Sequence, residues 1–187
     1  MKKIISLLLA MVLLVPALAI AEDVPTFDFT AEEWLERYKA IVPEGDPFYF
    51  DSLTKVQDNE IYAYQAKTEY SGGFSLAGRL GSDLLFGLDF YIREYNFQDY
   101  KESTIFPETF LALFDGFAKV ILATNPEFTT EDITAIFEAL GIDREKWDYQ
   151  FFKGTYVAEY KGMDYLYSGR GNQRFVMSIM ADPTHQE

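Results

Sequence analysis

Apolar residues recur at two spacings along this chain, and the spacing alternates between helical and strand-like stretches. From Thr30 to Pro43 they return every three or four positions, which predicts a helix with one buried face. Thr30 and Glu33 have the spacing of a capping box that begins this helix, and Pro43 ends it. From 48 to 95 the pattern is strand-like and broken by turn residues. The expected strands are Phe48–Leu53, Ile61–Thr68, Phe74–Leu80 and Leu84–Glu94.

Helical spacing returns after Pro107. The stretch from Phe110 to Leu122 is apolar nearly all round, which predicts a central helix buried on most of its sides. A third helix is expected after Thr129, because Asp132 completes a second capping box and Gly141 follows as a C-terminal stop.

Strand-like residues resume from Tyr149 to Met180, with hairpin turns at Lys161-Gly162 and at Gly169–Asn172. The order of elements is therefore helix, strands, two helices, strands. This order predicts an α+β fold in which antiparallel sheet packs against about three helices.

The segments that open the first and third helices resemble each other: Phe29–Glu33 and Phe128–Asp132. A duplicated helix-plus-sheet unit would explain the similarity, and so would independent use of the same capping box. Because no low-complexity linker separates the halves, we expect a single domain over residues 22–187.

The N-terminus has the features of a cleaved signal peptide over residues 1–21. Lys2 and Lys3 precede an apolar run that contains Pro16 and ends in small residues before Glu22. An uncleaved membrane anchor is the alternative, but Pro16 and the small residues favour cleavage. We therefore expect a secreted protein with no membrane span after cleavage.

Charge and composition exclude several function classes. With 16 basic and 30 acidic residues the net charge is −14, the wrong sign for a nucleic-acid partner. The chain has no cysteine, and its one histidine, His185, lies near the C-terminus. Thiol chemistry, zinc sites and triads with an internal histidine are therefore not expected, and no metal ion or cofactor is predicted.

The end of the central helix, the sequence Ile121–Glu127, leads into a capped helix that ends at Leu140-Gly141 and then into an aromatic hairpin sheet. This pattern resembles that of a loose set of uncharacterised secreted bacterial proteins. The resemblance covers about the last 80 residues and concerns structural positions, so it implies export and a fold but no activity.

The last hairpins place tyrosines on one face of the expected sheet. A two-residue turn at Lys161-Gly162 sets Tyr156 opposite Tyr167, and alternate residues then share a face. A loop over Gly169–Asn172 sets Arg174 opposite Tyr167, on that same face. The candidate ligand-binding residues are therefore Tyr156, Tyr160, Tyr165, Tyr167 and Arg174.

Two interpretations of this tyrosine face are open. Tyrosines offer a flat amphipathic surface, and an adjacent arginine can hold a carboxylate, which suits a protein, peptide or glycan partner. Alternatively the helices cover this face and the tyrosines belong to the core, which the need to pack three helices favours. The same registers put Val157, Leu166, Phe175 and Met177 on the opposite face as candidate core.

Three carboxylates are candidate catalytic residues of an alternative function, hydrolysis of polysaccharide or peptidoglycan. Glu159 and Asp164 are expected opposite each other, and paired carboxylates are what glycosidases use. Asp89 lies among apolar neighbours, although a solvent-facing position or an ion pair with Arg79 or Arg93 is the simpler account. With 30 acidic residues, accidental pairs are common.

The sequence therefore favours an exported, non-enzymatic module that binds a protein, peptide or glycan. The carboxylate-dependent hydrolase is the alternative, and a titration or an Ala substitution at Tyr165 would separate the two. A homo-oligomer is a third expectation, in which the apolar central helix completes its burial against a second copy.

Overall fold

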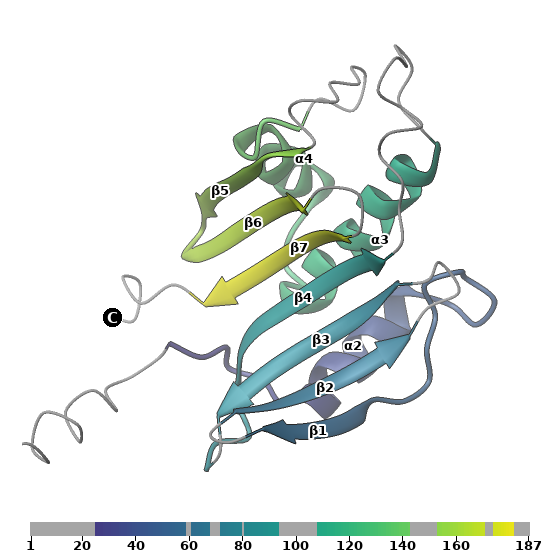
Figure 1. The fold of residues 1–187 in the computed structure, drawn as a ribbon, viewed down its shortest axis with the longest axis vertical. Helices are drawn as coiled ribbons and strands as arrows, with labels where there is room; N and C mark the ends of the chain where they lie inside the picture. Colours follow the sequence, from purple (N-terminus) through teal and green to yellow (C-terminus); the bar gives the residue numbers. More distant parts are fainter. Residues whose placement is uncertain are drawn as a thin grey trace, which may run out of the picture.

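The computed structural model describes residues 25–58, 61–67, 72–79, 81–93, 108–142, 153–170 and 174–181. These residues form one antiparallel sheet of seven strands with three helices behind it (Figure 1), which confirms the α+β prediction. The expected signal peptide, residues 1–21, lies outside the described residues. The elements are α2 (Ala31–Ile41), β1 (Thr54–Asp58), β2 (Ile61–Lys67), β3 (Gly72–Arg79), β4 (Leu85–Arg93), α3 (Glu108–Thr124), α4 (Thr130–Ala139), β5 (Thr155–Tyr160), β6 (Met163–Arg170) and β7 (Arg174–Ala181).

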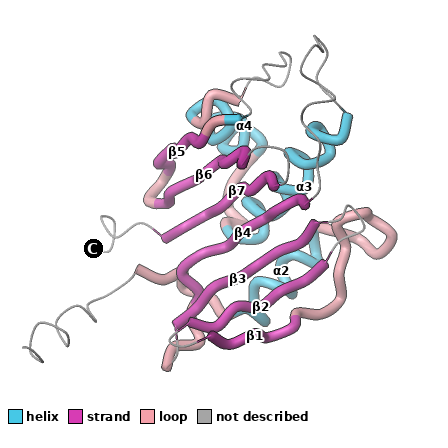
Figure 2. Tube along the Cα trace, in the orientation of Figure 1, coloured by secondary structure: helices cyan, strands magenta, loops and turns pink. Residues whose placement is uncertain are grey.

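The sheet has the order β1-β2-β3-β4-β7-β6-β5. Each half is a meander, and the last strands of the two halves, β4 and β7, pair antiparallel at the centre of the sheet (Figure 2). The chain thus runs inward from each edge, as a duplicated unit would. Two unrelated meanders that meet at their last strands give the same order.

Both predicted capping boxes form. Thr30 Oγ1 accepts a hydrogen bond from the Glu33 amide at 3.2 Å, and the Glu33 carboxylate accepts one from the Thr30 amide at 2.8 Å. Thr129 and Asp132 repeat this arrangement at the start of α4. Each box satisfies amides that a helix N-terminus leaves without a partner, so α2 and α4 begin where the sequence predicts.

The central helix is α3, and its apolar side chains are buried within its own chain. Gly116 allows the close contact, because a Cβ at that position would lie 3.1 Å from ring atoms of Phe48 and Phe90. The predicted burial of α3 is confirmed, since most of its described apolar side chains are fully buried. The side chains of α3 with 1% or less of their surface exposed include Leu113, Phe114, Phe117, Val120 and Ile121.

The expected strand Phe48–Leu53 is wrong, since the chain reaches the sheet only at Thr54. Phe48 and Phe50 are nevertheless buried, which accounts for the strand-like alternation. Their segment is held by side chains instead of a neighbouring strand. Tyr38 donates from its hydroxyl to the Phe48 carbonyl at 3.1 Å.

The expected register between β6 and β7 is also wrong. Tyr167 pairs with Met177 and not with Arg174, which pairs with Arg170 instead. The difference is three residues, and an odd shift moves every side chain of a strand to the other face. Met177 is therefore fully buried on the tyrosine face, together with Phe175.

The prediction that Val157, Leu166, Phe175 and Met177 form a core on the face opposite the tyrosines is therefore wrong. Val157 and Leu166 do lie on the other face from the tyrosines, but Val157 is 59% exposed there. The helices pack on the tyrosine face, so the second interpretation of that face describes the fold.

We expect Tyr167→Ala to lower the free energy of unfolding by about 3–5 kcal/mol, because it removes a fully buried ring. Val157→Ala, on the neighbouring strand, is the control and should change it by less than about 0.5 kcal/mol. Urea denaturation of the two variants and the wild type measures both. A Tyr167→Ala protein as stable as the Val157→Ala protein would contradict the assignment of Tyr167 to the core.

Candidate functional site

The tyrosines that the sequence places on one face lie there, with the predicted β5–β6 register. Tyr156 pairs with Tyr167, and Tyr165 is opposite Ala158. Tyr165 and Tyr167 have no exposed surface. Burial raises the pKa of both phenols, so they stay protonated at physiological pH. In this conformation neither ring offers a surface on which a ligand could stack.

The other members of the predicted set lie nearer the edge of the sheet. Tyr156 is half-buried, with its ring centroid 6.1 Å from that of Tyr167. Tyr160 is also half-buried and meets Phe128 edge-on at 5.9 Å. Arg174 begins β7, and its side chain lies outside the part of the structure that is described. The structure therefore does not assemble the five residues into one exposed surface.

Tyr160 belongs to a network centred on Asp132, the capping residue of α4. The Asp132 carboxylate accepts hydrogen bonds from the Tyr160 hydroxyl at 2.8 Å and from Lys161 Nζ at 2.6 Å. It also accepts from the backbone amide of Thr129 at 2.8 Å. The Lys161 ammonium lies 4.9 Å from the centre of the Phe128 ring. We call this set, Phe128, Thr129, Asp132, Tyr160 and Lys161, the Asp132 clamp.

The Asp132 clamp fixes the β5–β6 turn to the start of α4. The hydrogen bond from Lys161, followed by that from the Thr129 amide, holds the pKa of Asp132 well below its ordinary value. The same contact raises the pKa of Lys161. Lys161 has a φ of +48°, a left-handed backbone conformation that residues other than Gly, Asn and Asp rarely adopt. The ion pair with Asp132 stabilises Lys161 in this conformation. The carboxylate is thus ionised near neutral pH, where it acts as a structural group.

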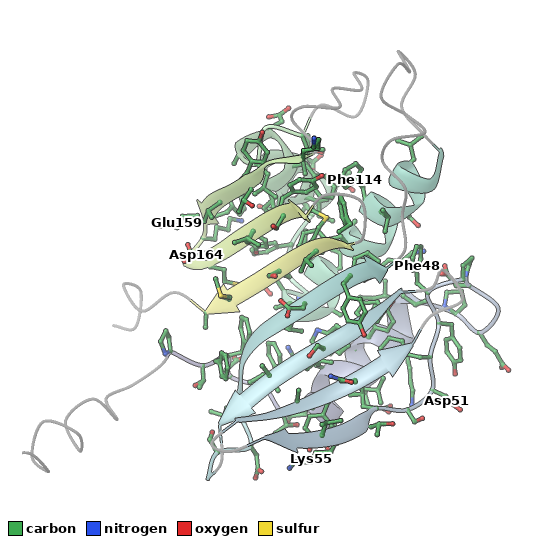
Figure 3. All side chains as sticks on the ribbon, in the orientation of Figure 1. Phe48, Asp51, Lys55, Phe114, Glu159 and Asp164 are labelled. Atoms are coloured by element: carbon green, nitrogen blue, oxygen red, sulfur yellow. The ribbon has the colours of Figure 1, made fainter. Side chains whose placement is uncertain are left out.

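The three candidate catalytic carboxylates lie on the face of the sheet opposite the helices. Glu159 and Asp164 are directly opposite each other, as predicted, and Figure 3 shows them side by side near the ends of β5 and β6. Asp89 lies on β4, on the far side of β7 from Asp164, and accepts a hydrogen bond from Ser178 Oγ at 2.6 Å. The structure thus brings two of the three together and leaves the third apart.

Apolar side chains share this face with the carboxylates. On β5, β6 and β7 the outward positions hold Val157, Leu166, Val176 and Met180, which we call the apolar patch. No described helix lies over it. Val157 is 59% exposed and Met180 39%, and Val56, 46% exposed, is on the same face at the other edge of the sheet.

A cleft of about 380 Å³ lies away from all three carboxylates. It is formed where the N-terminal segment, α2, the α3–α4 connection, the β5–β6 turn and the end of β7 meet, and we call it the Arg37 cleft. Its lining residues include Pro25, Phe27, Asp28, Phe29, Arg37, Thr124, Asn125, Glu127, Gly162 and Met163.

Sequence reasoning missed the Arg37 cleft and the second role of Asp132. The capping box identifies Asp132, but no local pattern connects it to a lysine 29 positions later. The lining residues of the cleft come from five separate segments, so only the folded chain unites them.

Within the described residues no cluster of His, Asp and Glu has the geometry of a metal site. Among the helices described here, none is both long and apolar enough to cross a membrane. No family model matches the chain, and neither a curated protein nor a solved structure matches it.

The Asp132 clamp predicts how stability depends on pH. The pKa of Asp132 is lower in the folded chain than the ordinary value of 3.8 expected after unfolding. Its contribution to stability is therefore complete above about pH 4 and is lost as the pH falls further, because the unfolded chain takes up the proton first.

We expect Asp132→Asn to be less stable than the wild type near neutral pH and the difference to shrink on acidification. Thermal melts of both proteins from about pH 6 to about pH 2 measure this. Asp83→Asn, which changes an exposed carboxylate, is the control. A difference between Asp132→Asn and wild type that stays constant across this range would contradict the clamp.

Proposed function

We propose that this protein is an exported, non-enzymatic module that binds a partner protein through the face of its sheet opposite the helices. The observation that carries the proposal is the position of the exposed apolar side chains. Val56, Val157 and Met180 are the large apolar residues with substantial exposure in the described chain, and all three lie on that face.

The apolar patch supports a protein partner. Antiparallel sheets with one solvated face usually carry polar residues at the outward positions. Here Val157 pairs with Leu166, and Leu166 pairs with Ser178, which is flanked on β7 by Val176 and Met180. Apolar side chains that neighbour one another on a sheet face, with Val157 and Met180 exposed among them, are typical of interaction surfaces.

Acidic residues border the patch and suggest the charge of the partner. Glu159 and Asp164 lie beside Met180, and Asp89 lies beyond Ser178. An apolar centre with a polar rim is the usual composition of a protein interface. We therefore expect the partner to present apolar side chains with basic groups around them.

The alternative function, a carboxylate-dependent hydrolase, has less support. The Glu159–Asp164 pair does not line the Arg37 cleft. Asp89 lies apart from this pair, because β7 separates its strand from that of Asp164. Hydrolysis needs two carboxylates on either side of a bound bond, whereas these three lie on a sheet face. The proposal of export rests on the signal-peptide features of residues 1–21, which suit the cell envelope or the medium as its location.

The test compares capture of a partner by the purified, immobilised protein and two double variants. We expect Val157→Lys with Met180→Lys to reduce recovery from an envelope fraction by at least about tenfold, because charge replaces apolar contact. The matched control is Ala40→Lys with Ala139→Lys, which adds the same charge at exposed positions near the ends of α2 and α4. Cations there are favourable to a helix.

Circular dichroism should show all three proteins folded. Equal recovery by both double variants would show that the partner binds elsewhere and would contradict the proposal. Release of reducing sugar by the wild type, lost in Glu159→Gln, would favour the hydrolase instead.

A further inference from the structure

Two stacked phenylalanine rings form part of the wall of the Arg37 cleft. The Phe27 and Phe29 rings stack with centroids 5.0 Å apart and planes 11° apart. Their backbone is bonded to the start of β4, since the Phe27 amide donates to the Leu85 carbonyl at 2.7 Å. Pro25 and Met163 extend the apolar lining. At about 380 Å³ the cleft has the size of sites that enclose small molecules.

Arg37 supplies a positive charge to this cleft. Its guanidinium carbon lies 4.9 Å from the centre of the Phe29 ring, an arrangement that orients the group. Within the described chain Arg37 makes no ion pair. Glu33, one turn earlier on α2, interacts electrostatically with Arg37 but forms its hydrogen bonds with Thr30. The fork of N–H donors on Arg37 is thus available to an acceptor from outside.

Three lysines of the described chain differ from Arg37 in this respect, because each forms an ion pair. Lys39 pairs with Glu36 at 3.4 Å, Lys119 with Asp46 at 2.7 Å, and Lys161 with Asp132 at 2.6 Å. Arg37, by contrast, is half-buried and forms no ion pair with a carboxylate among the described residues. A planar guanidinium matches the geometry of a ligand carboxylate.

The remaining lining residues limit the charge of the ligand. Asp28 and Glu127 also line the cleft, and both are exposed. Two carboxylates repel a dianion such as phosphate more strongly than a single carboxylate, so the cleft favours a monoanion over a dianion at Arg37. The buried Thr124 adds no free donor, because its hydroxyl donates to the Val120 carbonyl and accepts from Trp34.

We propose that the Arg37 cleft binds a small monocarboxylate with an apolar body, its carboxylate on Arg37 and its body against the wall of Phe27, Phe29 and Met163. This ligand site is separate from the sheet face proposed above. Its residues lie on the N-terminal segment, α2 and the β5–β6 turn, and none of them belongs to the apolar patch. The two proposals are therefore tested independently.

Three probes that share a phenyl ring and differ in charge test the proposal by titration calorimetry with the full purified protein. N-acetylphenylalanine carries one carboxylate, N-acetylphenylalaninamide is neutral, and phenyl phosphate is a dianion. We expect the carboxylate probe to bind at least about tenfold tighter than either of the others, since a charge-assisted hydrogen bond is lost or a repulsion gained.

Arg37→Gln should remove this preference, and Arg37→Lys should retain part of it, because lysine keeps the charge but not the fork. Lys39→Gln, two residues along the same helix and outside the cleft lining, should bind as the wild type does. Thermal melts check that every variant is folded. No heat of binding with N-acetylphenylalanine at millimolar concentration, equal affinity for the amide, tighter binding of phenyl phosphate, or an unchanged preference in Arg37→Gln would each overturn the proposal.

Discussion

The contact of α3 with the two central strands is the constraint on which the rest of the fold depends. Strands β4 and β7 join the halves of the sheet, and α3 touches both. Gly116 lies against Phe90 of β4. The ring centroids of Phe114 and of Phe175 on β7 are 6.3 Å apart. Burial of large aromatic side chains is the main source of stability in a chain without disulfides. Because α3 binds this join on one side, α2 and α4 pack beside it on that same side.

One consequence is that the two faces of the sheet differ in their composition and burial. The face under the helices holds the tyrosines and phenylalanines, whereas the opposite face keeps Val157 and Met180 exposed next to acidic residues. A two-layer α+β fold buries only one side of its sheet, so outward apolar residues need another explanation. The partner proposed above would cover these residues, and Glu159, Asp164 and Asp89 would then form the rim of the contact instead of a hydrolytic site.

The sequence predicts the helices well because their ends carry local signals: the capping boxes at Thr30 and Thr129 act through atoms three residues apart. The Lys161-Gly162 turn fixes the β5–β6 register for the same reason. The β6–β7 register was not predictable from its turn residues, because strand pairing continues to Arg170 and resumes at Arg174, and the odd shift exchanged the faces. The Arg37 cleft has no local signal at all, since Phe29 and Met163 are brought together only by the fold.

The Asp132 clamp links these parts through a single turn. Lys161 is held by Asp132, the next residue, Gly162, lines the Arg37 cleft, and Met163 follows it in the same lining. Glu159 and Asp164 stand on the other face of the same hairpin, next to its turn. An ionised carboxylate that accepts hydrogen bonds from both Tyr160 and Lys161 reduces the freedom of the hairpin end. The cap of α4 therefore does more than begin a helix: it positions one wall of the cleft and one edge of the apolar patch together.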